Sequence, residues 1–148
     1  MANFSALITV EDRLAILDMF ARQSHAIDGG DAAGWAATYA LDGSFHSPTY
    51  QLTATGRPAL TEFADNSNSG AKARGEQFRH HVSAVMLTPK SATEVSSVSY
   101  LMILATTVDG TRVDRSVRMF DELVKVEGEW LVASRTVLRD DAELQPKQ

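Results

Sequence analysis

The chain has 148 residues, of which 44% are hydrophobic and 22% are charged, and its formal net charge is −5. These values predict one globular domain over residues 1–148 that is large enough to bury a core. The acidic balance and the lack of a Lys/Arg cluster argue against nucleic acid as a partner. No stretch of ~18 residues is apolar enough to span a membrane, no leader-like segment opens the chain, and cysteine is absent. A cytoplasmic protein without a membrane partner is therefore expected.

A helix is predicted to begin after Thr9, because Asp12 stands three residues later and can complete a capping box. An apolar stripe at spacings of three and four residues follows, and its next position is Asp28, just before Gly29-Gly30 ends the helix. The stripe consists of Leu14, Leu17, Ala21 and Ser24. A carboxylate that continues an apolar stripe is expected to point inward, although a solvent-exposed helix end is an open alternative for Asp28.

The sequence of the middle of the chain predicts short helices and strands. Asp31 should cap a second helix over Ala32–Ala40, and a third helix should begin at Gly56-Arg57-Pro58 and end near Asp65. The polar residues 66–77 are expected to form a loop or a cavity lid. Two short strands are predicted near 44–46 and 50–55.

From Phe78 onward the hydrophobic period changes to two, which indicates a meander of antiparallel strands. These strands are predicted near 78–88, 93–108, 112–126 and 129–139, and the polar tail 140–148 is expected to be frayed. Helices followed by a sheet indicate an α+β fold. We expect a conical barrel in which a curved antiparallel sheet packs on three N-terminal helices and encloses an apolar pocket.

Two residues are the predicted catalytic pair, Asp28 and His80. Strand alternation places His80 with Val82, Ala84 and Met86 on one face, and places His81 on the other. The face of His80 otherwise carries small or apolar side chains, so we predict that His80 points into the pocket. A buried carboxylate would fix the tautomer of the imidazole and stabilise the imidazolium, as acid–base catalysis requires. A structural histidine, or an inward His81, remains open.

Further side chains are candidates to contact a substrate. His25 and His46 are the weaker histidine candidates, and tyrosine hydroxyls could polarise a substrate oxygen. The full set comprises His25, Trp35, His46, Tyr50, Phe63, Tyr100, Met102 and Met119. No metal site is predicted, because the adjacent histidines diverge on a strand and no His-x-His or His-x₃-His pair exists. No glycine-rich phosphate loop is present either.

Several stretches resemble the nuclear transport factor 2-like superfamily, specifically its SnoaL-like (polyketide cyclase-like) branch. They are residues 26–31 with Trp35, 39–45, 55–60, 79–83 and 128–135. In members similar to scytalone dehydratase, bile-acid 7α-dehydratase and hexachlorocyclohexane dehydrochlorinase, the catalytic Asp and His fall on Asp28 and His80. The resemblance implies a cofactor-independent lyase of the dehydratase type that acts on a small hydrophobic carbonyl or hydroxy compound, cyclic compounds included.

The sequence also departs from these relatives. Ala84 stands where relatives often carry Asn, and Ile27 stands where scytalone dehydratase has Tyr. Ketosteroid isomerases share some patterns, but their base falls on Ser47 and their oxyanion tyrosine on Gln23, so their mechanism is disfavoured. A polyketide-type aldol cyclase, a double-bond isomerase, and the non-catalytic small β subunit of a ring-hydroxylating dioxygenase stay as alternatives. The open side of the sheet predicts a homodimer or homotrimer.

Overall fold

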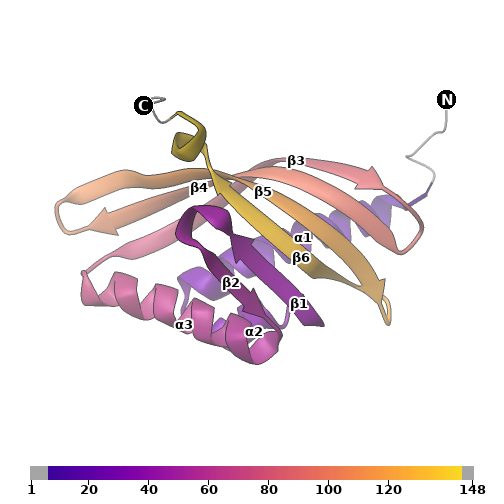
Figure 1. Cartoon of the computed structure of the whole chain (residues 1–148), viewed down its shortest axis with the longest axis horizontal. Helices are drawn as coiled ribbons and strands as arrows, with labels where there is room; N and C mark the ends of the chain where they lie inside the picture. Colours follow the sequence, from indigo (N-terminus) through magenta and orange to yellow (C-terminus); the bar gives the residue numbers. More distant parts are fainter. Residues whose placement is uncertain (1–6, 145–148) are drawn as a thin grey trace.

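The structure is a computed structural model and describes residues 7–144. In Figure 1 the long strands arch over the helices, and the side of the sheet away from the helices is uncovered over much of its length. The predicted α+β fold is confirmed. In chain order the elements are α1 (Val10–Asp28), α2 (Ala32–Ala36), β1 (Tyr39–Ser47), a 3₁₀ turn (Pro48–Tyr50), β2 (Leu52–Thr55), α3 (Arg57–Ala73), β3 (Gln77–Pro89), β4 (Glu94–Thr107), β5 (Gly110–Val126), β6 (Glu129–Arg139) and a 3₁₀ turn (Asp140–Leu144).

The six strands form one sheet in the order β2-β1-β6-β5-β4-β3. All neighbours are antiparallel except β1 and β6, which run parallel, a pairing that the sequence did not predict. The sheet curves but stays open, with β2 and β3 at its edges. None of the helices in the described residues combines the length and apolar character needed to traverse a bilayer.

Helix α1 begins as predicted but buries a different face. Thr9 Oγ1 accepts a hydrogen bond from the Asp12 amide at 3.0 Å, and Asp12 Oδ2 accepts one from the Thr9 amide at 2.9 Å, which completes the capping box. Leu14 and Leu17 are exposed, so the predicted inward stripe is wrong. The face against the sheet consists of Ile16, Met19, Phe20, Gln23 and Ile27. Asp28 is buried beside this face.

Two predicted boundaries are wrong because tertiary contacts override local propensity. Helix α2 stops at Ala36, and β1 starts at Tyr39, which pairs with Val132 of β6. Helix α3 runs through the predicted loop to Ala73. Its polar stretch is helical because Asn68 donates a hydrogen bond to the Ile27 carbonyl at 3.4 Å, and Ala71 is buried. The predicted frayed tail is a 3₁₀ turn up to Leu144, and its last four residues lie outside the described residues.

Irregularities in β3 and β6 change which side chains face inward. In β3 the pairing shifts between Ser83 and Met86, and Ala84 has a φ of 51°, a left-handed conformation that is uncommon for alanine. The predicted shared face of His80, Val82, Ala84 and Met86 is therefore wrong beyond Val82, because Met86 is exposed. In β6 the pairing shifts at Ala133, which opposes no residue of β5, so Val132 and Arg135 both face the interior.

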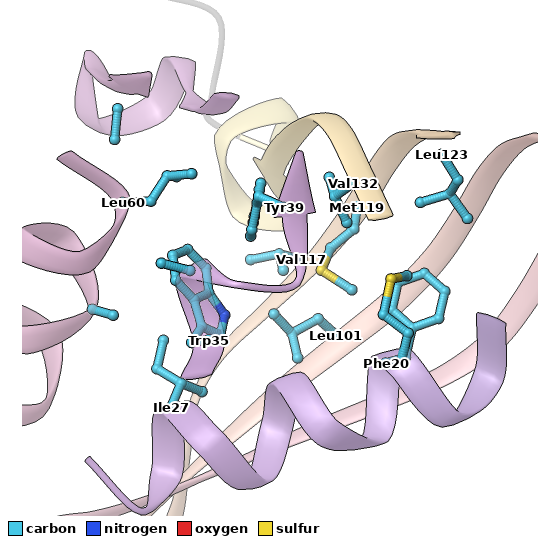
Figure 2. Packing of buried hydrophobic residues seen from close by; sticks show 14 of the residues in the cluster. Phe20, Ile27, Trp35, Tyr39, Leu60, Leu101, Val117, Met119, Leu123 and Val132 are labelled. Atoms are coloured by element: carbon cyan, nitrogen blue, oxygen red, sulfur yellow. The ribbon is translucent and has the colours of Figure 1, made fainter. Parts of the chain in front are cut away.

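The apolar core lies between α1 and the inner face of the sheet. Figure 2 shows side chains of α1 meeting side chains of β4, β5 and β6 there. The labelled residues are Phe20, Ile27, Trp35, Tyr39, Leu60, Leu101, Val117, Met119, Leu123 and Val132. A cavity lies next to this core, and its wall includes the core residues Ile27, Trp35 and Met119.

Candidate active site

Asp28 and His80 are in direct contact at the junction of α1 and β3. His80 Nδ1 lies 2.6 Å from Asp28 Oδ1, and Asp28 Oδ2 accepts a hydrogen bond from the His80 amide at 2.9 Å. The side chain of Asp28 is 6% exposed and that of His80 is 14% exposed. A carboxylate can only accept, so Nδ1 carries the proton and Nε2 presents its lone pair in the neutral imidazole. The predicted contact between the two residues is therefore present, and its geometry suits a proton acceptor at Nε2.

The ends of α1 and β3 are fixed to each other beyond this pair. Gln77 Nε2 donates to the Asp28 carbonyl at 3.0 Å, and Asn68 of α3 donates to the neighbouring Ile27 carbonyl. These bonds satisfy carbonyl groups at the C-terminus of α1 that have no partner within the helix. These two bonds fix the backbone at Ile27 and Asp28, and the position of the Asp28 carboxylate is fixed with it.

His80 forms part of the wall of a cavity of about 110 Å³ between the helices and the sheet. The wall is mainly apolar and aromatic. It is lined by Ile27, Trp35, Phe45, Ser47, Tyr50, Leu52, Phe63, Ser67, Phe78, His80, Leu101, Ile103, Arg115, Val117, Met119, Arg135 and Val137. Of the predicted substrate contacts, the structure thus brings Trp35, Tyr50, Phe63 and Met119 to the cavity together with His80.

Three aromatic rings form one end of the cavity. The rings of Phe45 and Phe63 stack with centroids 4.5 Å apart, and Phe63 lies 5.6 Å from Trp35. Such contacts stabilise both the fold and the shape of the wall, since aromatic pairs contribute about 0.5–1.5 kcal/mol beyond the area that they bury. The cavity is therefore a rigid apolar space with few polar groups.

The remaining predicted substrate contacts lie elsewhere. Tyr100 and Met102 are 57% and 41% exposed, because the inward residues of β4 are the odd-numbered ones, such as Leu101. His46 is exposed and its Nδ1 lies 2.7 Å from Thr53 Oγ1. His25 is exposed and lines an outer groove between α1 and β3. The structure therefore does not bring these four residues to the cavity, and their contact with a substrate stays a prediction.

Arg135 is a site residue that sequence reasoning did not identify. Its side chain is 5% exposed and bonds to both oxygens of Asp121, through Nε at 2.8 Å and Nη2 at 2.9 Å. Nη2 also donates to Gln23 Oε1 at 2.9 Å. Burial is the largest single effect and disfavours the charged guanidinium, but Asp121 and Tyr39 together outweigh it, so the pKa of Arg135 lies above its ordinary value. Arg135 is thus a permanent buried cation in the cavity wall.

Tyr39 packs beside this cation. The guanidinium carbon of Arg135 lies 5.7 Å from the Tyr39 ring centroid. Burial raises the pKa of the Tyr39 hydroxyl above its ordinary value, so the phenol stays neutral. No sequence pattern marks Arg135 as inward, because only the shift at Ala133 turns it to this face.

The described residues contain no group of three or more His, Asp and Glu side chains placed to hold a metal ion. The polar groups around the cavity are instead one imidazole, two guanidinium groups and a few hydroxyls. Ser47, which occupies the position of the isomerase base, is buried at the cavity wall and has no carboxylate to offer. Acid–base chemistry by His80 beside a fixed cation is what this arrangement can perform.

The sequence profile of the SnoaL-like domain family matches residues 9–136. No curated protein sequence matches the chain. Among solved structures, the chain is similar to Aln2 from a Streptomyces species, with a TM-score of 0.84 and 27% identity over 92% of this chain and 96% of that one. It is also similar to a protein from Catenulispora acidiphila in complex with S-DNPA, with a TM-score of 0.79 and 30% identity over 92% and 98% of the two chains.

A third structure shares the fold alone. It is an NTF2-like protein with a cystatin-like fold from Novosphingobium aromaticivorans, with a TM-score of 0.80 and 20% identity over 93% of this chain and 91% of that one. The resemblance drawn from the sequence is confirmed by these findings. Because the family profile covers most of the chain, the protein belongs to the SnoaL-like domain family.

Proposed function

We propose that the protein is a cofactor-independent lyase that eliminates water from a small hydrophobic, cyclic carbonyl compound, with Asp28 and His80 as the catalytic pair. The observation that carries this proposal is the 2.6 Å contact of Asp28 Oδ1 with His80 Nδ1 in the wall of an apolar cavity. Water exclusion by the apolar wall strengthens the electrostatic effect of both groups on a bound substrate.

In the proposed reaction, His80 Nε2 removes a proton from the carbon next to the substrate carbonyl. Asp28 stabilises the imidazolium that results, and the electron pair of the broken C–H bond becomes an enolate. The hydroxyl group on the next carbon then leaves and takes the proton from His80, which releases water and a conjugated double bond. The histidine returns to its neutral form, so no further reactant is needed.

Arg135 is the donor that we assign to the developing negative charge. It lines the cavity together with His80, and Asp121 and Gln23 hold its Nε and Nη2. Nη1 takes part in none of these bonds and is the donor best suited to a substrate oxygen. Of the three donors expected from the sequence, Tyr100 and His46 are exposed outside the cavity, whereas Tyr50 lines it and its hydroxyl accepts a hydrogen bond from Arg139.

Two observations favour catalysis over a purely structural role. A non-catalytic subunit has no need of an open cavity next to a paired histidine, yet this cavity is not filled by the neighbouring aromatic side chains. The similar protein from Catenulispora acidiphila was solved in complex with S-DNPA, which supports ligand binding by this chain as well. An aldol cyclase or a double-bond isomerase would use the same proton acceptor, so only the product separates these reactions from elimination.

The test combines two reactions. In deuterium oxide, the wild type should exchange the protons next to the carbonyl of 2-tetralone, as followed by proton NMR. With 3-hydroxy-1-tetralone, a cyclic β-hydroxy ketone, it should release water and form 1-naphthol, as followed by fluorescence. His80→Ala should reduce both rates by about 100-fold or more, since a positioned general base contributes 10²–10⁴-fold.

The adjacent histidine provides a matched control. His81 lies on the same strand, is exposed and does not line the cavity, so His81→Ala should keep both rates. Proton exchange without 1-naphthol formation would favour the isomerase or cyclase alternative over the lyase. Full activity of His80→Ala in both reactions would refute the proposed catalytic pair.

A further inference from the structure

We infer that the substrate carries a carboxylate, and that Arg115 binds this group at the mouth of the cavity with Arg74 on the opposite wall. This inference rests on the proposed function, because it concerns the ligand of the same cavity. The expected substrate is a cyclic compound with one apolar ring inside the cavity and an acidic group outside it. The two arginines are at the positions where such a compound would leave the cavity.

The volume of the cavity limits what it can hold. About 110 Å³ is close to the size of an engineered cavity of about 150 Å³ that binds benzene. One ring therefore fills the space next to His80. The cavity opens into a groove of about 690 Å³, and the residues common to both are Tyr50, Leu52, Phe63, Ser67, Phe78 and Arg115. This groove is wide enough for the larger part of a ligand.

Arg115 stands at the boundary between the two spaces. It is the last inward residue at this end of β5, in line with Val117 and Met119, and its side chain is 33% exposed. Its guanidinium lies over the Tyr50 ring at 5.6 Å, and its Nε bonds to Asp114 at 2.9 Å. Tyr50 is fixed in turn by Arg139, which donates to its hydroxyl at 2.8 Å. The cation is thus held in place before any ligand arrives.

The ion pair of Arg115 leaves its best donors available. Asp114 is bonded through Nε, so neither of the two terminal amino groups of Arg115 takes part in that contact. Arg74, which follows the last residue of α3, shows the same arrangement: its Nε bonds to Glu76 at 3.1 Å and its guanidinium lies over Phe78 at 5.8 Å. Terminal guanidinium nitrogens bind planar carboxylates in a bidentate manner.

The charge of the groove agrees with an anionic ligand group. Of the described residues that line the groove, two are arginines and one, Glu62, is acidic. All three arginines are ion-paired, but Arg135 is buried with its Nε and Nη2 both bound to Asp121, whereas Arg115 and Arg74 are partly exposed and bind their partners through Nε. An acidic group would therefore stay at the mouth and would orient the ring so that it enters the cavity first.

The test compares two ligands of the same shape, 2-naphthoate and 2-naphthamide, by isothermal titration calorimetry. The wild type should bind the acid about tenfold more tightly than the amide, because charge-assisted hydrogen bonds are roughly twice as strong as neutral ones. Arg115→Gln should reduce this preference to about twofold, and the double variant with Arg74→Gln should abolish it.

Arg112→Gln is the matched control. Arg112 is on the same strand and bonds to both Glu76 and Asp114, but it does not line the groove, so this variant should keep the tenfold preference. Equal affinity of the wild type for both ligands, or no binding of the acid, would overturn the inference without any variant. An unchanged preference in folded Arg115→Gln would overturn the role of that residue.

The result can be separated from the proposed function. His80→Ala should lose proton exchange but keep the preference for the acid. Selective binding of the acid together with full exchange by His80→Ala would sustain this inference and refute the catalytic pair. Loss of exchange in His80→Ala without selective binding would sustain the catalytic pair and refute this inference.

Discussion

The contact between Asp28 and His80 can be tested by a change of one atom, Asp28→Asn. The carboxylate accepts two hydrogen bonds, from His80 Nδ1 at 2.6 Å and from the His80 amide at 2.9 Å. An asparagine has only one oxygen for these two donors. If its oxygen accepts from the backbone amide, its NH₂ group faces Nδ1, which must then give up its proton. Nε2 becomes protonated and can no longer accept a proton from the substrate.

The size of the effect follows from these contacts. A hydrogen bond to a charged group contributes about 1.5–3 kcal/mol, and a mismatched buried donor adds about 1 kcal/mol. A rise of about 2–4 kcal/mol in the activation barrier corresponds to a rate that is roughly 30- to 1,000-fold lower. The assay is the exchange rate of 2-tetralone in deuterium oxide, with the midpoint of thermal unfolding measured on the same samples.

Stability separates a catalytic role of Asp28 from a structural one. The side chain is neutral but nearly the same size in the variant, so the protein should stay folded while exchange slows. Exchange by Asp28→Asn at more than about a third of the wild-type rate would refute the reasoning, because it would mean that the carboxylate does not set the tautomer of His80. Loss of folding alone would be seen in the thermal unfolding curve.

Two further predictions concern stability and assembly. Asp12→Asn should lower the free energy of unfolding by about 2 kcal/mol at neutral pH, because Asp12 caps α1 and also accepts bonds from Lys125 and Trp130. These bonds, above all the one from Lys125, hold the pKa of Asp12 below its ordinary value of 3.8. The contribution of Asp12 to the free energy of unfolding is therefore complete above pH 3.8 and is lost as the pH falls below that value. Urea unfolding at pH 7 and pH 3 should therefore show a smaller difference between wild type and variant at pH 3, and an equal difference would contradict this. We also propose that copies of this chain assemble into a homodimer or homotrimer through the uncovered face of the sheet, where Tyr100 and Met102 are exposed. Light scattering should then give the mass of a dimer or trimer, and Met102→Lys should shift it towards the monomer; a wild-type monomer would refute the pairing.

Much of the site could be predicted from the sequence because local signals fixed it. The capping box of Thr9 and Asp12 and the glycine pair after Asp28 set both ends of α1. The period of two from Phe78 onward predicted the start of β3 to within one residue, since β3 begins at Gln77, three residues before His80. Asp28 and His80 lie close to these two well-marked ends, so their places at the end of α1 and near the start of β3 were predictable.

Local sequence signals did not predict which face of an element is buried where both of its faces carry apolar or small side chains. Residues 97–104 of β4 are apolar or small on both faces, so the sequence did not show that Leu101 points inward and Tyr100 outward. The first helix has two apolar stripes, and only packing against the sheet decided that Ile16 rather than Leu14 is buried. In both cases the choice depends on neighbours that are distant in sequence.

The sequence by itself determined the α+β class, the order of the elements and the positions of Asp28 and His80. Tertiary structure decided the rest of the site. The shift at Ala133 turns Arg135 into the cavity, and the parallel pairing of β1 with β6 brings the 3₁₀ turn with Tyr50 to its mouth. A one-residue change of register moves every later side chain to the other face of a strand, and no local pattern records it.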